Sequence, residues 1–170
     1  MSESHRVVVP RVLVAAVIHG KSRAAETLAK AVAEEVRSAN FSLVRTVMVN
    51  GERQYIQQLV SNVSNGNEAD AILLVGGAGI GPRDDTCEAV DTFVERRLEG
   101  FGEAYRALLQ ADLGVRAMLT RATAGVYNQC LVFAMSGRES EVRRAMISLV
   151  VPIASEAVDL ATGHKHCDKH

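Results

Sequence analysis

The sequence predicts an α/β protein with three layers, α/β/α, and a mostly parallel central sheet. Short apolar runs of strand length alternate with segments whose apolar residues recur at helical spacing, which is typical of parallel strands joined by crossover helices. Hydrophobic residues make up 48% of the chain but aromatic residues only 4%, so the core must be aliphatic, as in sheets buried on both faces. At 170 residues we expect one domain over 11–162, with short tails at 1–10 and 163–170.

Charge and cysteine content narrow the choice of partners. The net charge of -1, from 19 basic and 20 acidic residues, provides no basic field for nucleic acid. Cys87, Cys130 and Cys167 are odd in number and widely spaced, so they indicate neither a disulfide framework nor a zinc ribbon. No segment approaches the roughly 20 apolar residues of a membrane span. We therefore expect a soluble cytoplasmic protein that binds small molecules or proteins, without nucleic acid or membrane as a partner.

The first half of the chain has the clearest periodicity. An apolar run at 12–18 predicts a strand, and Ser22 is a plausible N-cap for the helix that follows. A second strand is expected at 43–49. A second helix carries its apolar stripe through 56–63 and ends near 65–66, where Asn-Gly is a C-cap signal.

A third strand, at 69–75, leads into a glycine-rich turn at 76–81. After the turn, Asp85 can cap a helix that runs to Leu98, with Glu88 reaching back as in a capping box. A strand, a glycine turn and a helix start together make a cradle for an anion.

The second half is less regular. A short helical pattern follows 100–103, an irregular strand is expected at 115–120, and a clear strand at 130–135. The segment 136–139 then has the Ser-x-x-Glu spacing of a second capping box. Pro152 should kink or restart the last helix before Gly163.

Ligands of such sheets bind beyond the carboxyl ends of the strands, where both glycine turns must lie. The first turn lacks the Lys-Ser/Thr of a P-loop and has Pro82 where a dinucleotide fingerprint needs glycine. Inside the turn, Arg83 can hold a phosphate, and Asp84 can hold a metal ion or accept a proton. An ordinary strand-to-helix turn is the competing interpretation.

Other candidate residues each have a simpler alternative. Glu103 can hydrogen-bond a polar ligand or be an exposed helix-start acid, and Arg121 and Arg138 can complete a phosphate clamp or be solvated. Cys87 lies near a helix N-terminus, yet without a nearby base it is more often a packed thiol than a nucleophile. The segment 164–170 is rich in His, and terminal disorder competes with metal binding there.

Four short motifs in order and at family-like spacing carry a resemblance to the molybdopterin-binding family of molybdenum-cofactor biosynthesis (MoaB/MogA type). They are Gly76-Gly77-Ala78-Gly79 with Arg83-Asp84 and Thr86, Gly100-Phe101-Gly102-Glu103, Thr120-Arg121-Ala122 with Gly125, and Ser136-Gly137. The resemblance spans about residues 11–160.

The resemblance implies a homotrimer or homohexamer with a pocket for the pterin and its phosphate, and it allows other cofactor-biosynthesis proteins as partners. It also implies adenylylation of molybdopterin with Mg²⁺ and ATP, with Asp84 as the catalytic and metal-binding acid. The implied ligand-binding residues are Gly76, Gly77, Ala78, Gly79, Arg83, Thr86, Glu103, Arg121, Ser136 and Gly137.

Two departures from the family pattern bear on activity. Ala78 stands where the family usually has Thr, and Gly51 stands where the family usually has an Asp that helps with metal or substrate. Whether the chain is an enzyme therefore stays open. The alternative hypothesis is a non-catalytic protein on the same fold that binds molybdopterin or a partner, and a weaker one assigns another phosphorylated ligand.

Overall fold

The computed structural model describes residues 8–163 and contains a six-stranded sheet of order β2-β1-β3-β6-β5-β4. Neighbours among the first four strands of this order run parallel, whereas β5 is antiparallel to β6 and β4 is antiparallel to β5. The strands are β1 (Arg11–Ile18), β2 (Ser42–Asn50), β3 (Ala71–Val75), β4 (Arg96–Arg97), β5 (Thr123–Tyr127) and β6 (Cys130–Met135).

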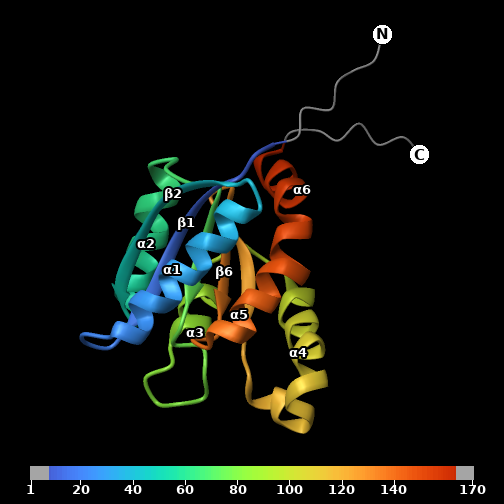
Figure 1. Cartoon of the computed structure of the whole chain (residues 1–170). Coiled ribbons are helices and arrows are strands. Elements are labelled where there is room, and N and C mark those ends of the chain that lie inside the picture. Colours follow the sequence, from blue (N-terminus) through green and yellow to red (C-terminus); the bar gives the residue numbers. More distant parts are fainter. Residues whose placement is uncertain (1–7, 164–170) are drawn as a thin grey trace.

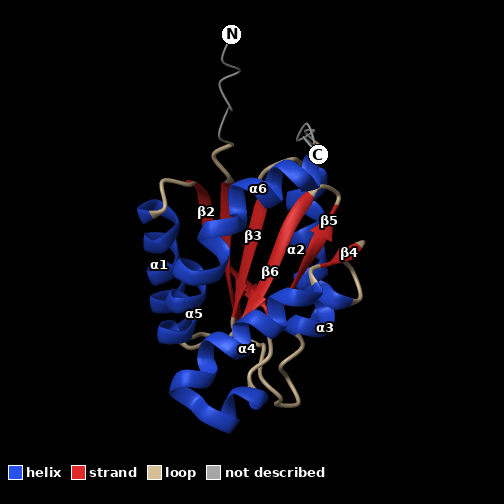
Figure 2. Cartoon of the chain, turned by 90° about the vertical axis from the view of Figure 1, so that its right-hand side faces the viewer, coloured by secondary structure: helices blue, strands red, loops and turns tan. Residues whose placement is uncertain are grey.

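Helices cover both faces of the sheet (Figures 1 and 2). One face packs against α1 (Arg23–Ser38), α4 (Glu99–Leu113), α5 (Glu139–Ala145) and α6 (Val151–Thr162). The other face packs against α2 (Arg53–Asn65) and α3 (Thr86–Asp91). The expected three-layer fold with a mostly parallel sheet is thereby confirmed.

The strongly periodic elements form where the sequence predicts them. The Ser22 side chain accepts a hydrogen bond of 3.2 Å from the Ala25 amide and so caps α1. The strand of 130–135 is buried along its whole length, as expected for a central strand between helical layers.

The predicted helix from Asp85 to Leu98 is wrong in length. It ends at Asp91, residues 96–97 form the edge strand β4, and the expected capping box is absent. The side chain of Asp85 pairs with Arg53 at 3.0 Å instead. Glu88 is likewise drawn away from the helix start, because its carboxylate pairs with Arg121.

Three further predictions in the second half are wrong. The segment 100–103 lies inside α4, and Gly114–Leu119 is a 3₁₀ helix, η1, in place of a strand. The predicted capping box at 136–139 is absent, because Arg138 is the N-cap of α5 and has no side-chain cap, while the Ser136 hydroxyl donates to Glu141 and accepts from the Arg138 amide.

Pro152 lies at the start of α6, as expected for a proline that restarts a helix. A π-helical turn, η2 (Met146–Val150), joins α5 to α6, and the continuous helix ends at Gly163, which adopts a left-handed φ of 72°. Proline lacks an amide donor and crowds the preceding turn, so a locally wider turn lets the helix continue.

This 24-residue helix, Glu139–Thr162, is long and apolar enough by length and composition to cross a membrane, contrary to our expectation. One of its faces nevertheless contributes Val142, Met146, Val150 and Val158 to the core. The rest of its surface, including Ile147 and Leu160, stays exposed.

The parallel register determines where the loops meet. Ala16 of β1 lies beside Val75 of β3, which lies beside Met135 of β6. The loops after these three strands therefore emerge together, at the lower end of the sheet in Figure 1.

Candidate functional site

The first glycine turn depends on two glycines with left-handed backbone. Gly76 has φ of 103° and Gly77 has φ of 63°. A Cβ on Gly76 would lie 3.0 Å from the Val17 carbonyl oxygen, and one on Gly77 would lie 2.5 Å from Oγ1 of Thr86. Thr86 is fully buried, and its hydroxyl donates to the Gly76 carbonyl oxygen at 2.8 Å. Thr86 therefore holds the turn from beneath, with its hydroxyl turned inward.

Asp84 lies within the same turn. Its Oδ2 accepts a 2.9 Å hydrogen bond from the Gly81 amide, and Cβ atoms on Gly79 or Gly81 would press against that oxygen. Among residues 8–163, Oδ1 of Asp84 and the exposed guanidinium of Arg83 have no hydrogen-bonding partner. Ala78 is buried. Of these side chains, Asp84 and Arg83 are the ones open to an incoming molecule.

Arg121 fastens the turn from outside. Its Nε donates to the Gly79 carbonyl oxygen at 2.8 Å and one terminal nitrogen donates to the Asp84 carbonyl oxygen at 2.9 Å. Both terminal nitrogens also pair with the carboxylate of Glu88. This hydrogen-bonded pairing raises the pKa of Arg121 and lowers that of Glu88. Arg121 thus makes four hydrogen bonds within the protein. These bonds stabilise the backbone of the first turn.

The glycine motif of α4 lies against the Arg121 segment. A Cβ on Gly102 would come within 2.6 Å of the Ala122 carbonyl oxygen, so only glycine permits this approach. Phe101 anchors the same turn of the helix, with its ring centroid 5.1 Å from that of Phe133. The neighbouring side chain of Glu103 is exposed.

The second glycine turn follows β6 and touches the first. A Cβ on Gly137 would lie 3.4 Å from the Gly76 Cα, and the Gly76 amide donates to the Met135 carbonyl oxygen at 3.1 Å. Ser136 is buried and donates to Oε2 of Glu141 at 2.6 Å. Sequence reasoning missed Glu141, since an acid five residues after a strand-end serine is not a recognised pattern.

All four motifs behind the resemblance are therefore linked by direct contacts. Arg121 joins the first turn, Gly102 joins the Arg121 segment, and Gly137 joins the first turn from the other side. Arg83, Asp84 and Gly137 lie on the accessible part of this assembly, and Ala78, Thr86 and Ser136 lie beneath it.

The end of β2 meets the same edge of the sheet. The Gly51 amide donates to the Ile18 carbonyl oxygen at 2.8 Å, and the imidazole of His19 covers Gly51 so closely that any Cβ there would overlap the ring. The Arg53–Asp85 ion pair ties the start of α2 to the first turn. An imidazole thus occupies the position that a side chain at residue 51 would take.

The Cys87 side chain, in α3, is buried. Burial raises the pKa of the Cys87 thiol to about 12, so it is a packed side chain and not a thiolate nucleophile. Within the described part of the chain, no group of three or more His, Cys, Asp or Glu side chains could hold a metal ion. The His-rich segment and Cys167 lie outside the described residues.

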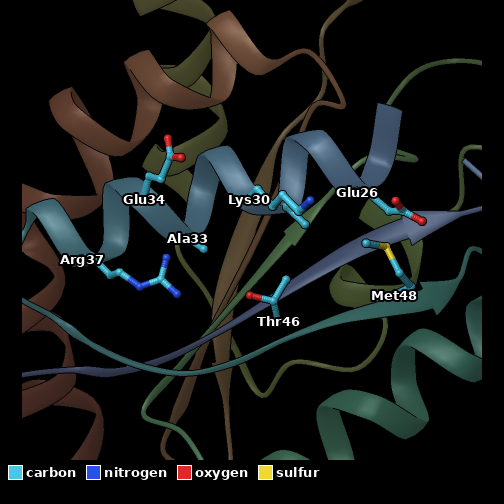
Figure 3. Close-up of a pocket in the computed structure, with 8 residues that line it drawn as sticks. Glu26, Lys30, Ala33, Glu34, Arg37, Thr46 and Met48 are labelled. Atoms are coloured by element: carbon cyan, nitrogen blue, oxygen red, sulfur yellow. The ribbon is translucent and has the colours of Figure 1, made fainter. Parts of the chain in front are cut away.

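Two surface hollows lie away from the glycine turns. One, of about 390 Å³, is bounded by Glu26, Lys30, Glu34 and Arg37 of α1 and by Thr46 and Met48 of the edge strand β2 (Figure 3). The other, of about 160 Å³, is lined by residues that include Asp70 and Asn128. Neither contains a motif residue, so both are separate from the place where the glycine turns meet.

Comparison with known proteins agrees with this geometry. Residues 8–156 match the family model described as "Probable molybdopterin binding domain". The Molybdenum cofactor biosynthesis protein B of Staphylococcus epidermidis is 41% identical over 102 residues, 59% of this chain and 58% of that protein. The protein of the same name from Bacillus cereus is 35% identical over 120 residues, 70% of this chain and 71% of that protein. The alignment with the Staphylococcus protein thus spans less than two thirds of that relative.

Solved structures extend the likeness over the whole fold. A crystal structure of a Molybdenum cofactor biosynthesis protein B superposes with a TM-score of 0.86 at 26% identity, covering 92% of this chain and 98% of that one. A molybdopterin biosynthesis protein from Mycobacterium abscessus gives a TM-score of 0.79 at 29% identity, covering 92% and 99%. With a family match over most of its length and the four motifs in contact, the chain belongs to the molybdopterin-binding domain family of the MoaB/MogA type.

Proposed function

We propose that this protein acts in molybdenum-cofactor biosynthesis and binds molybdopterin at the edge of the sheet where its two glycine turns meet. The contact between Gly137 and Gly76 carries the proposal, because it joins two turns that follow neighbouring parallel strands. Backbone amides in such turns can surround an anion, and glycine lets a ligand approach the backbone closely. The choice of molybdopterin as the ligand comes from the descriptions of the matching family and of its relatives.

Binding is the better-supported half of the function. Arg121 and Thr86 are used to shape the first turn, and Gly51 offers no carboxylate beneath the His19 ring. These features give a shaped surface on which Asp84 is an accessible acid without an ion-pair partner among residues 8–163, whereas the neighbouring Asp85 is paired with Arg53.

Adenylylation of molybdopterin is the second candidate, favoured by the open Oδ1 of Asp84. Mg²⁺ is commonly held by one or two carboxylates together with substrate phosphates, so Asp84 alone could hold it when ATP is bound. The metal would neutralise charge on the transferring phosphoryl group. Asp84 itself would orient the assembly from inside a turn whose backbone Arg121 fixes.

A binding experiment tests the first proposal. Purified full-length protein should bind molybdopterin in calorimetry, and Gly137→Asp should weaken binding by about tenfold or more, because a carboxylate would face the ligand phosphate. The matched control is Ala107→Asp, which adds the same charge at an exposed position of α4. Absence of molybdopterin binding by the unaltered protein, with clear binding of a nucleotide, would favour the alternative phosphorylated ligand.

Turnover separates the two candidates. Protein incubated with molybdopterin, Mg²⁺ and ATP should release pyrophosphate if it is an adenylyltransferase, and Asp84→Asn should abolish the release. Asparagine can still accept the Gly81 hydrogen bond, so the variant removes charge while keeping the turn. Binding without pyrophosphate release would instead identify a non-catalytic binding protein.

The remaining expectations are proposals that follow from the family. We propose a cytoplasmic homotrimer or homohexamer that meets other cofactor-biosynthesis proteins. Sedimentation of the purified chain would measure the assembly directly.

A further inference from the structure

The second glycine turn contains a buried acid with an exposed cationic partner. Glu141 is only 6% exposed, and its Oε2 accepts from the buried Ser136 hydroxyl at 2.6 Å. Its Oε1 accepts from a terminal nitrogen of Arg138 at 3.0 Å. A buried carboxylate is costly unless it is paired and hydrogen-bonded, so Ser136 and Arg138 together make this burial tolerable.

The same network fixes the backbone at Arg138. The Arg138 amide donates to the Ser136 hydroxyl oxygen at 3.2 Å, so side chain and backbone are tied to one pair of buried residues. Beneath them lies Tyr105, which is fully buried. Burial raises the pKa of Tyr105, and among residues 8–163 its hydroxyl has no hydrogen-bond partner. A polar layer thus lies under the second turn, while the Arg138 side chain stays 63% exposed above it.

The three arginines near the turns differ in what remains available. Arg121 is consumed by the first turn, and Arg83 is exposed but has no side-chain support in the described part of the chain. Arg138 is both supported and open, because one terminal nitrogen is anchored on Glu141 and the rest of its donors have no partner among residues 8–163. It also directly follows Gly137, which touches Gly76.

We propose that Arg138 is a phosphate-binding residue of the pocket and that Glu141, together with Ser136, is its positioning residue. A guanidinium anchored at one corner can present its other donors to a phosphate with little loss of side-chain freedom. The inference rests on the proposed function in one respect, namely that the bound phosphate belongs to molybdopterin. The chemistry it requires is a phosphate monoester or a free phosphate.

The test uses the full-length protein, with inorganic phosphate and molybdopterin as separate probes. Arg138→Ala should weaken binding of both by about tenfold or more, whereas Arg138→Lys should retain part of it. Arg116→Ala is the matched control, since it removes the same charge from the exposed face of η1. Equal phosphate affinity in Arg138→Ala and Arg116→Ala would overturn the proposal.

A spectroscopic readout isolates the positioning role. Adding phosphate to the unaltered protein should shift the side-chain ¹⁵N resonance of Arg138, and the shift should shrink in Glu141→Gln if Glu141 orients the guanidinium. A purely structural Glu141 would lower thermal stability in that variant and leave the phosphate-induced shift unchanged, which would overturn its assignment as a positioning residue.

The outcomes separate this inference from the proposed function. Phosphate binding through Arg138 without molybdopterin binding would support the inference and refute the pterin. Undiminished molybdopterin binding in Arg138→Ala would refute the inference and leave the proposed function standing. A protein that shows no phosphate-dependent shift at Arg138 would also refute the inference.

Discussion

The two glycine turns follow neighbouring parallel strands and touch each other, yet they use charge in opposite ways. In the first turn a cation, Arg121, spends its donors on backbone carbonyl oxygens and on Glu88, and both side chains are about one third exposed. In the second turn an anion, Glu141, is taken up by the fold and its partner Arg138 faces outward. The difference teaches that an arginine in a motif that predicts phosphate binding can be structural, while a less conspicuous arginine nearby keeps most of its donors exposed.

Backbone strain should distinguish the two turns most strongly. Gly76→Ala places a side chain at φ of 103° and presses it on the Val17 carbonyl oxygen. We expect it to lower the free energy of unfolding by about 2–3 kcal/mol. Gly137→Ala meets only the Gly76 Cα at 3.4 Å and should cost less than about 1 kcal/mol. Urea unfolding measures both, and equal costs would contradict this view of the turns.

Removing Arg121 should loosen the first turn alone. Arg121→Met deletes the donors to the Gly79 and Asp84 carbonyl oxygens and leaves Glu88 without its partner. Because the side chains are about one third exposed, we expect a loss of only about 1–2 kcal/mol. Hydrogen exchange should accelerate in the first turn and not in the second, and Arg116→Met serves as the control. Uniform acceleration across both turns would mean that Arg121 supports the whole edge.

The second turn should respond to loss of one hydroxyl. Ser136→Ala leaves a buried oxygen of Glu141 without its donor and should cost about 1 kcal/mol. Ser140→Ala is a matched control, since Ser140 is exposed in the same segment. If thermal unfolding shows the two variants to be equally stable, the Ser136–Glu141 bond contributes nothing to the fold.

Acid should affect the first turn by the smallest amount. The hydrogen bond from Arg121 lowers the pKa of Glu88 below its ordinary value of 4.5. The folded protein therefore holds that proton less tightly than the unfolded chain. The resulting stabilisation is fully present above pH 4.5 and is lost as the pH falls through the lower folded pKa.

Nuclear magnetic resonance titration of the Glu88 carboxyl carbon measures this pKa directly. Asp70 also has a lowered pKa, with Arg11 as its partner, so global acid unfolding does not isolate the turn. Comparing the acid unfolding of the unaltered protein with that of Glu88→Gln isolates the contribution of the first turn. A midpoint at or above the ordinary value would contradict the Arg121–Glu88 pairing.

Local periodicity predicted much of the fold but not the ends of its elements. The strands β1, β3 and β6 and the helix α1 follow from apolar patterns that no distant residue alters. The expected helix after the first turn was too long because Asp85 and Glu88 bind Arg53 and Arg121, which are 32 and 33 residues away in the chain. A capping pattern considers only residues adjacent in the sequence, so it cannot predict ion pairs with residues this far away in the chain.

For the candidate site, too, the sequence predicted some features and not others. The motifs identified the residues that meet at the sheet edge, but their side-chain directions depend on packing. Nothing in the order of residues indicates that Thr86 and Ser136 face inward or that Glu141 supports Arg138. The covering of Gly51 by His19 also joins two separate loops and appears only in three dimensions.

The fastening of the first turn by Arg121 and Thr86 has a consequence for binding kinetics. A loop already held in shape loses little conformational entropy when a ligand arrives, so the pocket is pre-organised. Association should then proceed as a single step without a slow closing phase, and changes in ligand contacts should appear in the dissociation rate.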